Sequence, residues 1–224
     1  MGAGSGGRLW WEGDVGIPDQ AAMWIRAYRL IAGLAVLGTA AYLLVVSSNR
    51  ANFFSFFTIQ SNLIAAVVLL IGAIALPAAT LRWDLVRGGA AIFMILTGVV
   101  YNTLLVGLEG SLQTTDPWAN DLLHRVIPVV MLFDFLIVPL AHRVTWRQGL
   151  TWAIYPLLYL AYTLIRGPIV DWYPYPFLDP RRDGGYPRVA LMCVAILIGF
   201  VAVVWLLTEI NAWRLRSGNR ARTA

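Results

Sequence analysis

The sequence contains no lysine, one cysteine and two histidines, and only 13% of its 224 residues are charged. A single cysteine, Cys193, excludes an intramolecular disulfide and a metal site built from a cysteine cluster. The first 20 residues are rich in glycine and carry no apolar run, so the pattern of a secretory signal peptide is missing. We also find no internal repeat and no second, polar domain.

Apolar residues dominate what is present. They make up 59% of the chain, and the mean hydropathy is +0.68. A water-soluble globular protein of this size does not need such a balance. Because the bilayer core is about 30 Å thick, one helical crossing takes about 20 mostly apolar residues. The chain therefore has room for six or seven crossings with short connections.

Six uncharged or nearly uncharged runs predict six transmembrane helices, in an all-α, polytopic membrane bundle. Polar, glycine or proline residues separate the runs, as expected for loops. We divide the chain into a flexible tail at 1–22, a six-helix domain at 23–211 and a basic tail at 212–224. The six predicted helices cover residues 24–46, 55–76, 88–108, 121–141, 149–165 and 188–210.

The basic residues are all arginines, and they predict the orientation. With both termini inside, eleven arginines fall on the inner side and five on the outer side, with Arg125 near the start of the fourth helix. The positive-inside rule then places the termini in the cytoplasm, in what we expect to be a bacterial cytoplasmic membrane. The inner set is Arg8, Arg26, Arg29, Arg82, Arg87, Arg143, Arg147, Arg214, Arg216, Arg220 and Arg222. The outer set is Arg50, Arg166, Arg181, Arg182 and Arg188.

The net charge of +5 does not indicate nucleic-acid binding, because these arginines occupy helix ends and a short tail without a base-stacking motif. We interpret them as membrane anchors, and we expect membrane lipids as partners. We expect no metal and no cofactor. The sequence leaves the oligomeric state open.

This orientation places two residues at the same depth. The helices predicted at 55–76 and 121–141 both run inward from the outer face, and Thr58 and His124 lie in their first turns. Thr58 also belongs to a polar stripe with Ser55, Ser61 and Asn62, at three- and four-residue spacing. Such a stripe should face the bundle interior, either to hydrogen-bond neighbouring helices or to form a site.

The fourth predicted helix carries the strongest signals. Asp116 and Pro117 are typical of an N-cap followed by proline at the first helical position. Pro128 removes the partner of the His124 carbonyl and predicts a kink there. Asp121, three residues before His124, is placed to orient its ring. Asp134 lies about 15 Å further along, so it cannot join His124 directly, and its carboxyl has either a structural role or a place in a proton path.

Several short motifs resemble the androgen-induced and androgen-dependent family of membrane threonine hydrolases, in a bacterial branch. They are Phe57-Thr58-Ile59-Gln60-Ser61-Asn62, then Asn120-Asp121-Leu122-Leu123-His124 with Asp134 ten residues later. Two more follow, Trp172 with Tyr175-Pro176-Phe177-Leu178, and Leu206-Leu207-Thr208-Glu209-Ile210-Asn211. The likeness spans the second to the sixth predicted helix. The chain departs from the family pattern at Asn62 and in the spacing of Pro128 from His124.

The resemblance implies an intramembrane hydrolase that cleaves fatty acid esters of hydroxy fatty acids or similar lipid-like esters. It places the nucleophile at Thr58 and the base at His124. A threonine hydroxyl needs such a base, and a neutral imidazole can remove its proton. Hydrogen-bond donors must also stabilise the oxyanion, and Ser61, Asn62 and Asn102 are candidates either for this role or as supports of the site.

The aromatic outer loop fits the rim of such a site. Trp172, Tyr175 and Phe177 either contact the substrate there or anchor the loop among lipid headgroups, and we favour anchoring. Arginines 166, 181 and 182 are candidates to bind a fatty-acid carboxylate or a lipid phosphate.

Two other functions remain open at this stage. In a non-enzymatic transporter or channel, Thr58, Asn62, Asn102, His124 and Asp134 would line a polar path between the helices. The absence of a clear inverted repeat counts against it. A haem or quinone protein is disfavoured because the second histidine, His142, lies at the opposite end of its helix.

Overall fold

The computed structural model describes residues 19–75, 77–108 and 116–223, with side chains described up to residue 217. These residues form helices and no β-strand, which confirms the predicted all-α class. The first 18 residues of the predicted N-terminal tail lie outside the described part. The predicted C-terminal tail is the end of the last helix, which continues to Thr223.

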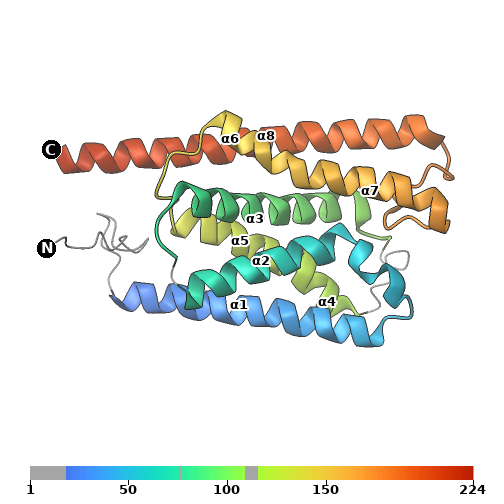
Figure 1. Cartoon of the computed structure of the whole chain (residues 1–224), viewed down its shortest axis with the longest axis horizontal. Helices are drawn as coiled ribbons and strands as arrows, with labels where there is room; N and C mark the ends of the chain where they lie inside the picture. The colour runs from blue at the N-terminus through green and yellow to red at the C-terminus, as the bar shows by residue number, and fades with distance from the viewer. Residues whose placement is uncertain (1–18, 76, 109–115, 224) are drawn as a thin grey trace, which may run out of the picture.

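The helices run side by side along the long axis of the molecule (Figure 1). α1 (Asp19–Val46) is followed by the short η1 (Arg50–Ser55) and by α2 (Phe57–Ile74). α3 (Leu81–Val100) continues into η2 (Tyr101–Leu105), and α4 (Pro117–Asp121) continues through η4 (Leu122–Val126) into α5 (Ile127–Ile137). The remaining elements are α6 (Trp146–Leu150), η5 (Thr151–Ala153), α7 (Ile154–Val170), η6 (Pro176–Leu178) and α8 (Gly185–Thr223).

Five of these helical segments are long and apolar enough to cross a membrane. The helical stretch 117–137 is of similar length, but it is not one of the five, because it carries three charged residues, Asp121, Arg125 and Asp134. Large apolar side chains such as Ile31, Leu158 and Ile198 are exposed, as expected for a surface that faces lipid. The five segments are Gln20–Val46, Phe57–Ile74, Leu81–Leu105, Trp146–Val170 and Gly185–Ser217.

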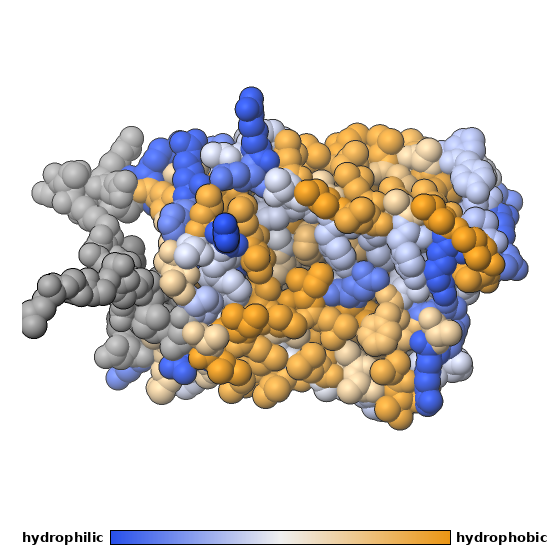
Figure 2. Space-filling model, in the orientation of Figure 1, coloured by the Kyte–Doolittle hydropathy of each residue, from blue (hydrophilic) through white to orange (hydrophobic). Residues whose placement is uncertain are grey.

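Hydrophobic side chains cover the middle of the face shown in Figure 2, and hydrophilic ones gather mainly at the two ends. The start of α1 and the end of α8 lie at the same end of the molecule (Figure 1). This arrangement matches a bundle that stands across a bilayer.

The helix α3 lies between two apolar cores and contributes side chains to both. Ala90 and Met94 on one face pack into a core with α1, α2, α4 and α5. Ile92 and Phe93 on the other face pack against α7, η6 and α8. α1 and α2 approach closely because small residues line their contact, as at Gly33, which lies against α2.

Candidate active site

Thr58 is the second residue of α2, at the N-terminal end of that helix. Phe56, the residue before the first residue of α2, is extended, and its side chain does not cap the helix. The amide N–H of Thr58 has no carbonyl within the helix to bond, because the first turn of any helix leaves its N–H groups unpaired. It donates instead to the hydroxyl of Tyr175 at 3.1 Å. The Thr58 side chain is only 6% exposed and lies on the buried polar stripe that the sequence predicts.

His124 brings its ring to Thr58, and the distance from His124 Nε2 to Thr58 Oγ1 is 3.1 Å. The other ring nitrogen, Nδ1, lies 2.9 Å from the backbone carbonyl of Asn120. Since a carbonyl only accepts, Nδ1 carries the ring proton, and Nε2 accepts the hydroxyl proton of Thr58. The nucleophile and the base predicted from the sequence are therefore in contact, with the base in the correct tautomer.

The backbone around His124 is wound as a π-helix, η4. The sequence predicts a kink here because Pro128 has no N–H, and the structure resolves the irregularity as one wider turn in which the Ile127 N–H bonds the Leu122 carbonyl. The Leu123 carbonyl accepts instead from Asn62 Nδ2. Such π-bulges often occur at functional sites because they redirect a side chain. Here the bulge carries the imidazole.

Asn62 links the helical turn of Thr58 to the helical turn of His124. Its Nδ2 donates to the Thr58 carbonyl at 2.9 Å and to the Leu123 carbonyl at 3.1 Å. Both protons of the amide are thus committed to backbone. Ser61 likewise bonds the Thr58 carbonyl and the hydroxyl of Thr97. We predicted Ser61 and Asn62 as oxyanion donors or as supports of the site, and their hydrogen bonds favour the supporting role.

A second layer of side chains fixes the imidazole. The ring of Tyr101 stacks on His124, with centroids 4.3 Å apart and an interplanar angle of 27°. The Tyr101 hydroxyl accepts a short hydrogen bond from the side-chain amide of Asn120, whose carbonyl holds Nδ1. Sequence reasoning missed Tyr101, because an aromatic residue at the end of an apolar helix is usually a membrane anchor.

Two predicted roles on the fourth helical stretch are wrong. Asp121 pairs with Arg125, both half exposed, and the Asn120 carbonyl rather than Asp121 orients His124. Asp116 precedes Pro117 at the helix start as predicted, but its carboxylate caps no N–H and instead accepts from the Tyr42 hydroxyl. Asp134 lies in a separate cluster.

In that cluster, Asp134 is 5% exposed and accepts hydrogen bonds from Arg29 at 2.5 and 3.0 Å and from Arg87 at 3.2 Å. The hydroxyl of Tyr28 donates to the same carboxylate. We expected Arg29 and Arg87 to be anchors at the inner interface, yet both are buried inside the bundle. In the sequence, Asp134 is an acidic residue within an apolar run. This was the signal for a buried partner of opposite charge, because an unpaired buried carboxylate is costly.

Asn102 is also away from the site. Its side-chain amide donates to the Gly98 carbonyl one turn back, and its oxygen accepts from Arg125. The residue is exposed. It therefore cannot donate to an oxyanion at Thr58, contrary to our prediction.

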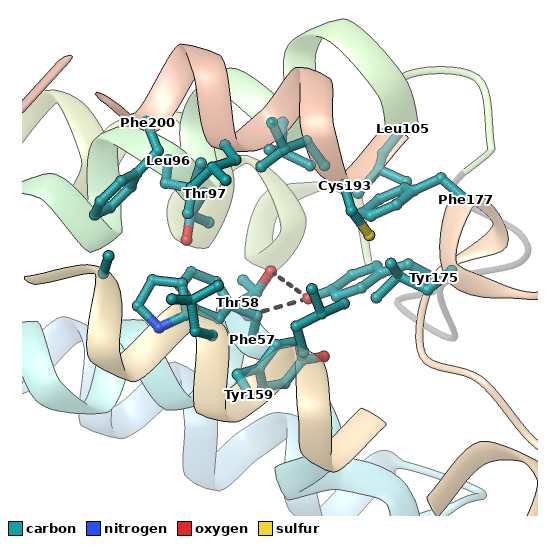
Figure 3. A pocket seen from close by; sticks show the side chains of 18 residues that line it. Phe57, Thr58, Leu96, Thr97, Leu105, Tyr159, Tyr175, Phe177, Cys193 and Phe200 are labelled. Atoms are coloured by element: carbon teal, nitrogen blue, oxygen red, sulfur yellow. Dashed lines mark hydrogen bonds between the residues drawn. The ribbon is translucent and has the colours of Figure 1, made fainter. Parts of the chain in front are cut away.

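A largely apolar cavity opens beside the Thr58 hydroxyl (Figure 3). The volume of the cavity is about 120 Å³. Its walls come from α2, η2, α3, η5, α7, η6 and α8, and the polar side chains among them are few. Along α8 the wall extends from Cys193 to Phe200, about 10 Å at helical rise. The other residues of the wall are Phe57, Thr58, Leu96, Thr97, Val100, Leu105, Ala153, Pro156, Leu157, Tyr159, Leu160, Tyr175, Phe177, Leu178, Ile196 and Leu197.

The outer loop contributes directly to this cavity. Tyr175 and Phe177 are buried, stack on each other with centroids 5.3 Å apart, and line its wall. Our preference for lipid anchoring is therefore wrong for these two residues. Trp172 is half-buried, packs edge-on against Phe56 and lies below the guanidinium of Arg166, outside the cavity wall.

The three arginines considered for a carboxylate have partners within the loop region or no contact with the cavity. Arg166 donates to the side chain of Asn52, and Arg181 pairs with Asp171 and Asp179. Arg182 is exposed. Among the described residues, no cluster of three or more histidine, cysteine or acidic side chains is arranged to hold a metal.

Together these contacts define a buried threonine–histidine pair at the edge of an apolar cavity. The chain was compared with protein-family models, curated proteins and solved structures, and none of them matches it.

Proposed function

We propose that the protein is an intramembrane hydrolase of lipid-like esters, with Thr58 as nucleophile and His124 as general base. The observation that carries the proposal is the 3.1 Å contact between Thr58 Oγ1 and His124 Nε2, in which the Asn120 carbonyl fixes the proton on the opposite ring nitrogen. A base oriented by a third group and bonded to a hydroxyl is the arrangement that activates an alcohol nucleophile.

The reaction follows in two halves. Thr58 Oγ1 attacks the ester carbonyl while its proton moves to His124 Nε2, and the carbonyl electron pair moves to the oxygen. The tetrahedral intermediate then collapses, the alkoxide leaves with the proton from Nε2, and an acyl-threonine remains. Water attacks this acyl group while Nε2 takes a proton from the water, the bond from the acyl carbon to Thr58 Oγ1 breaks, Oγ1 takes the proton from Nε2, and the acid departs. The sum is one ester and one water converted to one acid and one alcohol.

The cavity supports an acyl chain as the apolar part of the substrate. It lies against Thr58 and is lined almost entirely by aliphatic and aromatic side chains. Transfer of a hydrocarbon chain from water into such a cavity is favourable. Fatty acid esters of hydroxy fatty acids, or esters of similar form, have the required carbonyl next to long chains. They match the substrate class that the sequence resemblance implies.

We further propose that the chain crosses a bacterial cytoplasmic membrane six times with both termini inside. The helical stretch 117–137 would be the sixth crossing. Its three charged residues are satisfied within the protein, since Asp134 meets Arg29 and Arg87, and Asp121 meets Arg125. The site would then lie near the outer leaflet.

The contacts favour a hydrolase over a transporter with a polar path. The polar side chains expected along such a path fall into two groups, each bonded to its own partners: Thr58, Asn62 and His124 in one, and Asp134 with its arginines in the other. Asn102 faces outward. A continuous path would require these groups to open toward each other.

The test is ester hydrolysis by the purified full chain in detergent, with a panel of lipid esters. We expect the wild type to release fatty acid, and Thr58→Ala and His124→Ala to lose at least about 10³-fold in rate, as for other residues that act as a catalytic unit. The matched control is Thr208→Ala, because Thr208 is equally buried but bonds only carbonyls of its own helix. Equal turnover in the wild type and in both site variants would contradict the proposal.

A fluorophosphonate probe gives an independent check on the nucleophile. The wild type and Thr208→Ala should be labelled, and Thr58→Ala should not. Labelling that persists without Thr58 would assign the nucleophile to another residue.

A further inference from the structure

The proposed reaction needs a donor for the oxyanion, and the donors expected from the sequence are not available. Both Asn62 amide protons go to backbone carbonyls, the Ser61 hydroxyl bonds the Thr58 carbonyl and Thr97, and Asn102 faces away. None of the three lines the cavity. The donor must therefore be a different group that faces the cavity beside Thr58.

The structure assigns this role to Tyr175: we propose that its hydroxyl is the catalytic donor that stabilises the oxyanion formed at Thr58. This inference rests on the proposed hydrolase function. The Tyr175 hydroxyl lies 3.2 Å from Thr58 Oγ1 and on the cavity wall, where the carbonyl of a bound ester must arrive (Figure 3). The oxyanion is bonded to the carbon that Thr58 Oγ1 attacks, so a hydroxyl this close to Oγ1 can reach the distance of about 2.7–3.1 Å at which oxyanion donors act.

The hydrogen-bond network directs the phenol proton of Tyr175 toward Thr58 Oγ1. The Nδ1 proton of His124 goes to the Asn120 carbonyl, so the Thr58 hydroxyl proton occupies the contact with Nε2. The contact between Thr58 Oγ1 and Tyr175 must then be filled by the tyrosine proton. When Oγ1 attacks and becomes an ester oxygen, rotation about the phenol C–O bond transfers this hydrogen bond to the new oxyanion.

The N-terminus of α2 strengthens the donor. The amide N–H of Thr58 donates to the phenol oxygen at 3.1 Å, which draws electron density from the O–H. The positive end of the helix dipole acts in the same direction. Burial raises the pKa of Tyr175, which keeps the phenol protonated. The oxyanion is thus bound through Tyr175 to the helix end that carries its own nucleophile.

The loop holds the ring in place without the hydroxyl. Tyr175 stacks on Phe177 at an interplanar angle of 3° and packs edge-on against Phe56. Phenylalanine at position 175 retains both contacts. The change Tyr175→Phe therefore removes the donor and keeps the wall of the cavity intact.

The test compares Tyr175→Phe with the wild type on an ester that the wild type hydrolyses. We expect kcat to fall about 100-fold with KM changed by less than about threefold, since an oxyanion donor acts only in the transition state. The matched control is Tyr155→Phe, because Tyr155 stacks on Phe57 beside the site but its hydroxyl bonds Gln60. Its kcat should stay within about threefold of the wild type.

A binding measurement separates a donor from a structural residue. The Thr58 hydroxyl can add to the carbonyl of a long-chain trifluoromethyl ketone and form an oxyanion. The matching secondary alcohol has no carbonyl and forms no oxyanion. Tyr175→Phe should lose affinity for the ketone and keep its affinity for the alcohol. Replacing Tyr175 by 3-fluorotyrosine, which keeps both ring and hydroxyl, should retain kcat.

Two results would overturn the inference while the hydrolase stands. One is a kcat of Tyr175→Phe within threefold of the wild type. The other is an equal loss of ketone and alcohol binding, which would make Tyr175 only part of the wall. A wild type that neither hydrolyses the ester panel nor binds the ketone would instead overturn the hydrolase function and this inference with it.

Discussion

At the scale of single residues, the site depends on bonds between side chains and backbone. The Asn120 carbonyl sets the tautomer of His124, and the Thr58 amide holds the Tyr175 hydroxyl. A carbonyl cannot accept a proton at neutral pH, so it fixes the imidazole orientation without becoming a competing base. Substitution tests the side-chain partners of this network directly.

Asn62 is the first such partner, as a positioning residue that links the turn of Thr58 to the turn of His124. Asn62→Ala should lower kcat about tenfold or more with KM little changed, because small displacements of reacting groups are costly in rate. Steady-state kinetics on the same ester measures this. The control is Asn211→Ala, since Asn211 is equally buried and accepts from the Val144 amide far along α8. If both variants kept the wild-type kcat, the linking role would be refuted.

Asp134 gives the second residue-scale prediction. Asp134→Asn leaves Arg29 and Arg87 buried without their carboxylate, and breaking a buried pair in this way costs about 3–5 kcal/mol. Thermal unfolding in detergent should show a clearly lower midpoint, with kcat per folded molecule unchanged. Asp183→Asn, at an exposed loop position, is the control. An unchanged midpoint together with lost activity would indicate a proton path instead.

Some of this network was predictable from sequence and some was not. Thr58 and His124 are marked by polarity in apolar runs and by equal depth, and both lie where expected. Tyr175 was expected at the rim, but not its bond to Thr58. Sequence spacing gives depth along a helix, whereas the direction of a loop residue depends on packing from α2 and α8. The partners of Asp134 were missed because depth alone does not pair helices.

At the scale of elements, the two irregular helices matter most. Pro128 predicts a disturbed turn, yet the choice between a kink and a π-helix depends on whether another group satisfies the released carbonyl. Asn62 of α2 does so at Leu123. The first-turn position of Thr58 is similar, since the extended residue Phe56, rather than any capping side chain, sets where α2 begins.

The stretch from η5 into α7 forms one side of the cavity and should limit acyl-chain length. Ala153 lies on the wall, just before the N-terminal end of α7 and away from the Tyr175 loop. Ala153→Phe should fill space there, so hydrolysis of long-chain nitrophenyl esters should fall about tenfold while that of short-chain esters persists, since hydrocarbon burial is lost only for the long chains.

The control for this change is Ala161→Phe, because Ala161 is exposed on the same helix and lies off the cavity wall. It should retain the chain-length profile of the wild type. A profile that shifts equally in both variants would show that the cavity does not hold the acyl chain.

At the scale of the whole molecule, the boundaries of the helices follow from hydropathy and punctuation. The prediction of 55–76 for the second helix compares with Phe57–Ile74 in the structure, and 149–165 for the fifth compares with Trp146–Val170. The sequence could not show that α3 stands between two cores, because both of its faces are apolar. Contacts between helices, rather than composition, determine which neighbours each face meets.

The proposed six crossings with inner termini can be tested by the accessibility of single cysteines. In a Cys193→Ala background, Ser48→Cys should react with a membrane-impermeant maleimide on intact cells, and Ser217→Cys only after the membrane is opened. Both positions are exposed, and five of the six crossings would separate them. Mass-tagged maleimide and gel shift give the readout. Labelling of both cysteines from the same side would refute an odd number of crossings between them.

The position of Tyr175 in the chain also orders the assembly of the site during synthesis. Thr58, His124 and the Asp134 cluster all belong to residues 19–137, which are synthesised before α7 and α8. Tyr175 follows in the loop between α7 and α8, where Phe56 and Phe177 pack against its ring. A chain that ends before this loop therefore contains the proposed nucleophile and base but lacks the proposed oxyanion donor, and we expect its hydrolysis to be slow until Tyr175 is in place.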